Sequence, residues 1–348
     1  MKSLLDDMKL IDKNLESEKS ELQNKRIFLT GGTGFIGKWL LHFFKYLDKH
    51  CEYNISVSVL TRDAKKFRTS QSDLLEGFEV SLIEGDVLTP ITSDEEFDYV
   101  IHGATDASAY LTENFPLKMF ETVVIGTKNT LDFAVRCRAK KFLHMSSGAV
   151  YGNQPYDLEK VAEDYIGAPI PTDVKATYAE AKRASEMLCA IYAKTYNLNF
   201  SVARIFAILG PMLSLDIHFA AGNFLRDAMG KRKIIIKGNG LPIRSYIYPT
   251  DLVAGLLKIL LKGTSGKAYN VGSEEGISIK HLASLVSRVL NSSAGVEILG
   301  REDSGWNLGR YVPSTKLIED ELGFTRNVTL EECILKTAVW NGWKREVI

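Results

Sequence analysis

The sequence predicts an α/β fold with a doubly wound parallel sheet and a smaller, partly interleaved C-terminal α/β lobe. Three observations support this prediction. Short apolar runs alternate with helix-forming stretches between residues 27 and 210, and strands that alternate with helices form parallel sheets. A glycine-rich turn joins the first apolar run to the first helical stretch. After Gly210 the pattern changes to shorter, mixed segments.

The first strand, turn and helix form the most informative stretch. An apolar run at 27–29 precedes the turn 31–37, Gly-Gly-Thr-Gly-Phe-Ile-Gly, and an amphipathic stretch at 38–47. Glycine permits a positive φ and leaves the backbone open to a pyrophosphate, which the free N–H groups of a helix start attract. This predicts a dinucleotide-binding (Rossmann) turn; a glycine turn without ligand is the alternative. The candidate cofactor-binding residues here are Gly31, Thr33, Gly34, Phe35, Ile36 and Gly37.

Further apolar runs predict the other strands of the sheet. They lie at 55–60, 80–83, 97–102, 141–145 and 200–209, and long helical patterns lie at 114–136 and 178–196. Sheets of this kind bind ligands at the carboxyl ends of their strands. Small or polar residues follow three of these runs and include Asp86, Val87, Ala104, Thr105 and Ser147.

The end of the second strand bears on the choice between NAD and NADP. An acidic residue at this point binds the ribose hydroxyl of NAD, whereas an arginine accommodates the additional phosphate of NADP. Arg62 comes first after the strand and Asp63 follows it. This order favours NADP and leaves NAD open, and a solvated pair of loop charges is the alternative.

Changes of pattern divide the chain into three parts. Residues 1–24 form a charged N-terminal helical extension, expected to pack on the body or on a partner subunit, or else to fray. Residues 25–210 form the dinucleotide-binding domain and residues 211–348 the substrate-binding lobe, with 245–272 expected to pack back on the first domain. The apolar stripe of the extension consists of Leu4, Leu5, Met8, Ile11 and Leu15.

The composition argues against several classes of protein. Lys and Arg total 43, as do Asp and Glu, so nothing indicates a nucleic-acid or anionic-membrane partner. The four cysteines are far apart and the six histidines lack metal-ligand spacing, so we expect neither disulfides nor a metal site. Only His218, near the presumed substrate lobe, stands out. No apolar run approaches the roughly 18 residues of a membrane span, and the acidic start is unlike a signal peptide, so we expect a cytoplasmic protein.

Tyr178 and Lys182 are the candidate chemical groups. They are four residues apart in a helical pattern and therefore project from one face. A cation beside a phenol favours the phenolate and is expected to lower its pKa, so the phenol can exchange a proton with a sugar hydroxyl. Ser147, at a strand end, is placed to hydrogen-bond the same oxygen. A surface tyrosine beside a solvated lysine is the alternative.

Together these motifs resemble the extended short-chain dehydrogenase/reductase family. The resemblance rests on the glycine turn, Asp86-Val87, Ser146-Ser147 before Val150-Tyr151-Gly152, and Tyr178 with Lys182. It extends from about residue 25 to the C-terminus. Within this family the chain looks like the NAD-dependent epimerase/dehydratase group, which acts on nucleotide sugars.

The resemblance implies roles for individual residues. Ser147, Tyr178 and Lys182 would form the catalytic trio. NAD or NADP would be contacted by Asp86, Val87, Ala104, Thr105 and Ile205, the last within the segment 204–206 that reaches the nicotinamide. Asn223 and Arg244 would hold the nucleotide-diphosphate sugar, with Arg310 as a second phosphate-binding arginine. Homodimerisation through two helices, including the one that carries Tyr178, is the family-level expectation.

One departure from the family guides the choice of reaction. The 4,6-dehydratases and several decarboxylases carry an acid directly after the residue that matches Ser147, whereas Gly148 and Ala149 follow it here. We therefore expect an NAD(P)-dependent nucleotide-sugar epimerase that oxidises its substrate transiently to a keto sugar, with C4 as the favoured position. The first alternative is an NADPH-dependent reductase of a nucleotide-linked 4-keto sugar. A dehydratase, a decarboxylase and a non-catalytic dinucleotide sensor rank lower.

Overall fold

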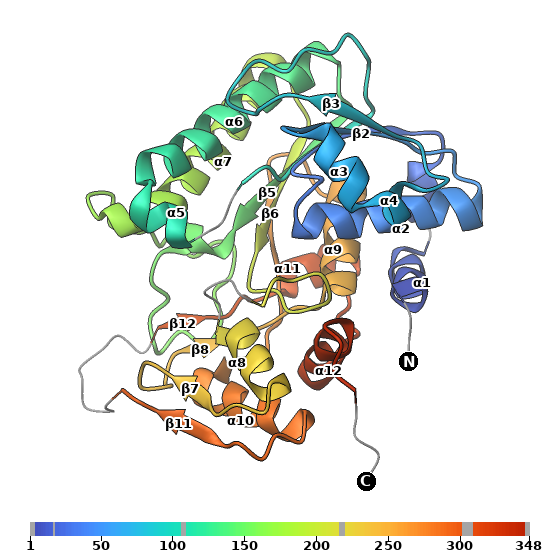
Figure 1. Ribbon diagram of the computed structural model, residues 1–348. Helices are drawn as coiled ribbons and strands as arrows, with labels where there is room; N and C mark the ends of the chain where they lie inside the picture. Colours follow the sequence, from blue (N-terminus) through green and yellow to red (C-terminus); the bar gives the residue numbers. More distant parts are fainter. Residues whose placement is uncertain (1–3, 17, 106–108, 216–219, 301–308, 345–348) are drawn as a thin grey trace.

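A seven-stranded parallel sheet forms the centre of the computed structural model, which describes residues 4–16, 18–105, 109–215, 220–300 and 309–344 (Figure 1). Its strand order is β3-β2-β1-β4-β5-β6-β9, and each neighbouring pair is parallel. The predicted fold class is thereby confirmed. The strands are β1 (Arg26–Thr30), β2 (Ser56–Thr61), β3 (Val80–Glu84), β4 (Tyr99–His102), β5 (Lys141–Ser147), β6 (Phe200–Ile205) and β9 (Ala268–Val271).

The strand order places a topological switch beside β1. The chain runs outward from β1 through β2 to β3, then returns to β4 on the other side of β1 and continues to β9. Ligands of open α/β sheets bind at the carboxyl edge of such a switch point. The ends of β1 and β4 lie side by side there, since Thr30 pairs with His102.

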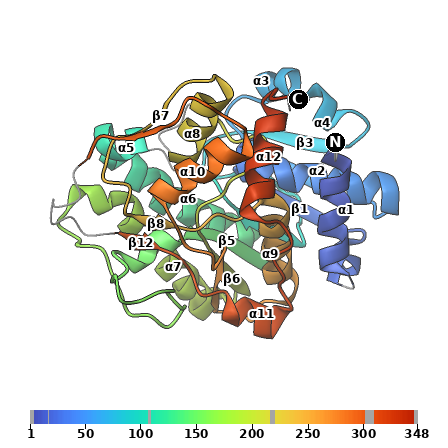
Figure 2. The same cartoon turned by 90° about the horizontal axis from the view of Figure 1, so that it is seen from below.

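Helices cover both faces of the sheet because successive strand residues point to opposite sides. On β1, Ile27 and Leu29 pack into one apolar cluster and Phe28 into another. The first cluster includes α2 (Phe35–Cys51) and α9 (Pro249–Lys262). The second includes α6 (Pro116–Arg136) and α7 (Thr177–Tyr196), which lie side by side in Figures 1 and 2.

The N-terminal segment packs against the first of these layers. Helix α1 (Leu4–Leu15) lies on α9, followed by the short helix η1 (Glu18–Leu22). Met8, Ile11 and Leu15 are buried, whereas Leu5 is exposed. The buried Asp7 accepts a hydrogen bond of 2.9 Å from the Tyr248 hydroxyl and forms an ion pair with Lys336. Tyr248 is the N-cap of α9, so α1 is held to the body of the same chain.

A smaller lobe lies below the carboxyl edge of the main sheet in Figure 1. It contains a three-stranded sheet, β10-β8-β12, and a two-stranded sheet, β11-β7. Its elements are α8 (Ala220–Met229), β7 (Ile234–Ile236), β8 (Ile243–Arg244), β10 (Ile277–Ser278), α10 (Ile279–Val289), β11 (Val296–Ile298) and β12 (Arg310–Tyr311). The chain continues into α11 (Lys316–Leu322) and α12 (Leu330–Trp340).

Several element boundaries differ from the sequence prediction, and two of the differences have a clear physical cause. The helix expected at 114–136 is α6, which begins at Pro116 and follows a separate helix, α5 (Ala109–Asn114), because Pro116 has no N–H to continue a helix and suits the first turn of a new one. The strand expected at 200–209 ends at Ile205. Beyond Ile205 the backbone leaves the sheet and forms hydrogen bonds with the backbone of Ile247. The N–H of Ile247 donates to the carbonyl of Ala207, and its carbonyl accepts from the N–H of Leu209.

The remaining elements are short: α3 (Ala64–Ser70), α4 (Ser72–Leu75), η2 (Gly148–Tyr151) and η3 (Val174–Ala176). Within the described part of the chain, none of the helices combines the length and the apolar character needed to cross a bilayer.

Candidate active site

The turn between β1 and α2 accepts only glycine at its closest contacts. Gly31 has a φ of +73°, and a Cβ added there would lie 2.5 Å from the carbonyl oxygen of Gly103. A Cβ on Gly37 would lie 2.3 Å from the Gly31 oxygen. Gly34 caps α2 without a side chain, so no side chain covers the first N–H groups of the helix. Bare backbone donors at a helix start are what a pyrophosphate requires, so this turn fits a dinucleotide.

The other candidate residues of this turn lie around the same helix start. Thr33 is exposed, and Phe35 and Ile36 are half-buried in the first turn of α2. Their contact with a cofactor remains a prediction.

A buried hydrogen-bond chain fixes the end of β4 beside this turn. The Thr30 hydroxyl oxygen accepts from the N–H groups of Gly103 and Ala104, both at 3.2 Å. Its single proton therefore points to Nδ1 of His102, 2.8 Å away. The proton on Nε2 of His102 then points to the Thr127 hydroxyl at 3.0 Å. Burial lowers the pKa of His102 to about 3, with a smaller effect from the Lys182 charge, so this imidazole is neutral.

The predicted trio comes together at the end of β5. Lys182 is buried, and its Nζ donates to the carbonyl of Met145 at 2.7 Å and to the Thr105 hydroxyl at 3.0 Å. The Nζ lies 6.0 Å from the ring centroid of Tyr178, and Ser147 is near enough to influence the pKa of that phenol. Tyr178 and Lys182 occupy the first two turns of α7 because that helix begins at Thr177.

Burial dominates the pKa values of this trio. It lowers the pKa of Lys182 to about 8, against an opposing effect of the Glu186 carboxylate. It raises the pKa of Tyr178, and Ser147 opposes that rise. The sequence-based expectation of a lowered phenol pKa is therefore wrong for this structure. Two of the three N–H groups of Lys182 donate to Met145 and Thr105, and the hydrogen bonds of the described residues include none from Lys182 to the Tyr178 hydroxyl.

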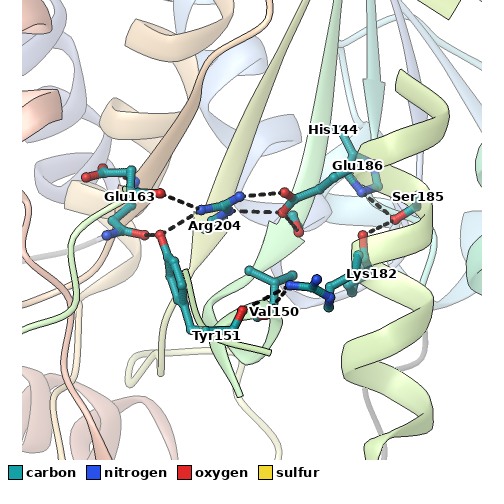
Figure 3. Close-up of polar contacts among 12 residues, drawn as sticks. His144, Val150, Tyr151, Glu163, Lys182, Ser185, Glu186 and Arg204 are labelled. Atoms are coloured by element: carbon teal, nitrogen blue, oxygen red, sulfur yellow. Dashed lines mark hydrogen bonds and ion pairs between the residues drawn. The ribbon is translucent and has the colours of Figure 1, made fainter. Parts of the chain in front are cut away.

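An ion pair supports α7 one turn beyond Lys182, as Figure 3 shows. Arg204 donates to Glu186 through two bonds, Nη2 to Oε2 at 2.7 Å and Nε to Oε1 at 3.1 Å. Ser146 donates to the same carboxylate at 2.6 Å. Arg204 also donates to the Tyr151 hydroxyl at 2.9 Å and to the backbone carbonyl of Glu163 at 3.3 Å. This network ties β5, β6 and α7 together.

The segment 204–206 was expected to reach the nicotinamide. The Arg204 side chain forms an ion pair with Glu186, on the α7 side of the sheet. Ile205 is buried in the cluster on the opposite face, with α2 and α9. Phe206 lies beneath Gly148, whose added Cβ would be 2.5 Å from the phenyl ring. A nicotinamide contact of Ile205 remains a prediction.

The carboxyl end of β2 carries Arg62 and Asp63, both exposed. The Asp63 carboxylate caps α3 by accepting from the N–H of Lys66 at 2.8 Å. Asp63 is therefore occupied in capping α3, whereas Arg62 has no such role at this strand end. At the end of β3, the Asp86 carboxylate accepts from the N–H of Leu88 at 3.0 Å. Val87 is buried, and its carbonyl accepts from Asn129 at 2.8 Å.

The smaller lobe supplies Arg244 and Tyr311, which pair across β8 and β12. Nη1 of Arg244 donates to the carbonyls of Gly309 at 2.7 Å and Ile243 at 2.9 Å, and burial lowers the pKa of this guanidinium. Among the described residues, Arg244 forms no ion pair with a carboxylate. The Tyr311 hydroxyl lies 3.4 Å from Oγ of Ser147.

Arg310 and Asn223 are not joined to this group by any hydrogen bond among the described residues. Arg310 precedes Tyr311 in β12. It donates to the backbone carbonyl of Glu159 at 3.3 Å, and its guanidinium lies 5.7 Å from the ring centroid of Tyr156. Asn223 is half-buried in the first turn of α8. Their roles in binding a diphosphate remain predictions.

The sequence reasoning missed Tyr311 as a site residue. Its strand has only two residues, so no alternating pattern marks it. The described residues hold no cluster of three or more His, Cys, Asp or Glu side chains suited to a metal ion. His218, singled out from the sequence, lies outside those residues.

The sequence of this chain was compared with models of known protein families. The model of the NAD dependent epimerase/dehydratase family matches residues 27–272. The chain belongs to this family. The cofactor of the family is a nicotinamide dinucleotide, which agrees with the glycine turn, and the resemblance inferred from the motifs is confirmed.

Individual relatives differ in the activity that their names give. UDP-glucuronic acid decarboxylase 1 of Xenopus tropicalis is 31% identical over 318 residues, which cover 91% of this chain and 72% of that protein. The UDP-N-acetylglucosamine 4-epimerase of Methanobrevibacter ruminantium has a TM-score of 0.77 at 20% identity, covering 92% of this chain and 98% of that one. The UDP-glucuronic acid 4-epimerase of Bacillus cereus, solved with NAD, has a TM-score of 0.75 at 21% identity, covering 90% and 96%.

Proposed function

We propose that this protein is an NAD(P)-dependent nucleotide-sugar epimerase that inverts C4 through a transient keto sugar. The observation that carries the proposal is the grouping of Ser147, Tyr178 and Lys182 at the carboxyl edge of the sheet, with no acid beside Ser147. Gly148 cannot be replaced by a larger residue without displacing Phe206, and Ala149 is apolar. Water elimination would lack a proton acceptor at this position.

Each residue of the site has a separate role in the proposed reaction. A nicotinamide dinucleotide held by the glycine turn 31–37 would supply the hydride acceptor and donor for C4. Tyr178 takes the proton of the C4 hydroxyl as the carbon is oxidised and gives it back on reduction. Ser147 hydrogen-bonds the same oxygen and positions it. Lys182 holds the end of β4 through Thr105 and supplies a positive charge that favours the phenolate.

The smaller lobe is proposed to bind the substrate. Arg244 is a half-buried arginine whose hydrogen bonds in the described structure go to backbone carbonyls, so its charge is available to a diphosphate. Asn223 and Arg310 are proposed as further contacts to the same group. The pairing of Arg244 with Tyr311 puts this anion site beside Ser147.

Decarboxylation of UDP-glucuronic acid is the second candidate function. The Xenopus tropicalis relative named above favours it, since its identity extends over 91% of this chain. Both candidates begin with the same oxidation at C4, and a 4-keto uronic acid then loses CO₂ readily. An NADPH-dependent keto-sugar reductase is the third candidate, which the exposed Arg62 favours.

One experiment separates these candidates. The purified protein is incubated with UDP-glucuronic acid, UDP-glucose and UDP-N-acetylglucosamine, and separately with a nucleotide-linked 4-keto sugar and NADPH. The products are identified by proton NMR while CO₂ and NADPH are measured. We expect a C4-inverted sugar with no release of CO₂ and no loss of NADPH. Release of CO₂ from UDP-glucuronic acid would establish the decarboxylase instead. Stoichiometric oxidation of NADPH by a 4-keto sugar would establish the reductase, and Tyr178→Phe is the inactive control.

We also propose that the protein is a homodimer joined through α6 and α7. These adjacent helices expose large apolar side chains, among them Leu117, Met187 and Ile191 at 70%, 61% and 48%. Apolar patches of this kind mark contact surfaces between proteins. Light scattering should give twice the chain mass for the wild type and for Leu299→Glu, a change at an exposed leucine of the other lobe. Leu117→Glu with Ile191→Glu should give a monomer, and an unchanged dimer would exclude this interface.

A further inference from the structure

Ser147 lies between two phenols, and it has one proton to give. Its oxygen accepts from the N–H of Ala149 at 3.2 Å. Its hydroxyl lies 3.4 Å from the hydroxyl of Tyr311 of β12, and Ser147 also lowers the pKa of Tyr178 of α7, against the effect of burial. A hydroxyl donates once and accepts twice. Ser147 can therefore donate to Tyr178 or to Tyr311, but not to both.

The surroundings of Tyr311 give its own proton two acceptors. The Tyr311 hydroxyl lies 3.4 Å from the Ser147 oxygen and 3.4 Å from the backbone carbonyl of Ile205. The ring is fixed against Phe206, with centroids 4.5 Å apart, so the hydroxyl proton can turn between the two acceptors while the oxygen stays in place. Burial raises the pKa of Tyr311, so this phenol remains a donor.

We infer that Tyr311 is a positioning residue that sets the ionisation of Tyr178 through Ser147. When Tyr178 is ionised, the Ser147 proton is drawn to the phenolate, and Tyr311 donates to the Ser147 oxygen in its place. When Tyr178 is protonated, it can donate to Ser147, and Tyr311 turns to Ile205. The smaller lobe thereby completes the hydrogen bonds of the catalytic serine. This inference deepens the proposed function and rests on it.

The charged and titratable groups around the two phenols agree with these roles. Tyr178 faces Lys182 on its own helix, at 6.0 Å from the ring centroid, and Tyr311 across the sheet edge. Tyr311 faces Tyr178, Arg244 of β8 and Tyr151 of η2. The Arg244 charge makes the Tyr311 hydroxyl a better donor, because a cation favours loss of the proton from a phenol.

Tyr311→Phe tests the inference, because it removes the hydroxyl and keeps the ring against Phe206. Loss of one donor to the ionised form should raise the pKa of Tyr178 by roughly 0.5 to 1 unit, since a hydrogen bond contributes about 1 kcal/mol. The acid limb of kcat should move to higher pH by that amount. Below the limb kcat should fall roughly 3- to 10-fold, whereas KM should change far less, because the ionisation and not the binding is altered. An unshifted limb would overturn the inference.

Two further variants separate this role from a merely structural one. Tyr99→Phe removes another buried hydroxyl, which donates to the carbonyl of Glu21 at 3.3 Å at the amino end of the sheet, and should leave the limb unchanged. Ser147→Ala should shift the limb by itself, and adding Tyr311→Phe to it should cause no further shift. Additive shifts would show that Tyr311 does not act through Ser147.

A measurement without substrate keeps the two proposals distinguishable. Tyrosine labelled with ¹³C at the ζ carbon reports the ionisation of Tyr178 by NMR in protein saturated with NAD⁺, and Tyr178→Phe assigns the signal. If Tyr311→Phe delays this titration but no nucleotide sugar is turned over, the inference holds and the proposed function fails. If sugars are inverted but the Tyr178 signal titrates identically in both proteins, or in neither up to pH 11, the inference fails and the proposed function holds.

Discussion

Removal of Arg204 should destabilise the protein strongly, because it leaves the Glu186 carboxylate without its partner. Both side chains are largely buried, with 17% and 15% of their surface exposed, and two N–H···O bonds join them. Breaking a buried ion pair by removing one partner costs about 3–5 kcal/mol. Tyr151 and the carbonyl of Glu163 lose donors as well. For Arg204→Met we therefore expect the free energy of unfolding to fall by about 4 kcal/mol.

A double-mutant cycle measured by urea unfolding tests this reasoning. Glu186→Leu alone should also destabilise, because it leaves the Arg204 charge without its carboxylate. Arg204→Met combined with Glu186→Leu removes both charges and should recover at least about 2 kcal/mol relative to Arg204→Met alone, since an apolar pair can replace a buried ion pair. A loss below about 1 kcal/mol for Arg204→Met would refute the reasoning, because it would show that the pair is solvated. Additive single and double variants would refute it equally.

Three further predictions follow from the site. Gly37→Ala should weaken NAD binding by at least tenfold in isothermal titration, because its Cβ would lie 2.3 Å from the Gly31 oxygen; equal affinity would contradict the close-packed turn. Lys182 has a pKa of about 8 in the folded protein against 10.5 for a free side chain, so the unfolded state binds more protons between these values. The stability of the wild type relative to Lys182→Met should therefore rise from pH 8 to pH 10 in urea titrations; a difference that is constant with pH would contradict the burial of the charge. Arg62→Asp should shift the ratio of NADP to NAD affinity towards NAD by at least tenfold, and no shift would place the ribose elsewhere.

The sequence predicted the parts of the site that depend on local structure. The glycine turn was recognised because its conformation is decided within a few residues, as the positive φ of Gly31 illustrates. Tyr178 and Lys182 were recognised because the helical period alone brings residues four apart to one face. The parallel sheet followed from the alternation of apolar runs with helical stretches.

The remaining features depend on contacts between distant segments. Arg204 pairs with Glu186, which lies on another element, and no local pattern in the sequence identifies this partner. Tyr311 reaches Ser147, 164 residues away, through a two-residue strand that gives no pattern. The pKa of Tyr178 was predicted in the wrong direction, because burial is the largest influence on it and spacing along a helix does not report burial.

Deuterium at C4 of the substrate provides the most direct test of the central claim that the sugar is oxidised and reduced again at one carbon. UDP-glucose and UDP-glucuronic acid labelled with deuterium at C4 are incubated with the purified protein and catalytic NAD⁺, and the products are analysed by NMR and mass spectrometry. The account predicts C4-inverted product that retains its deuterium, with no net change in cofactor, and no product with Tyr178→Phe. Product that has lost the label to solvent would contradict it, as would release of CO₂.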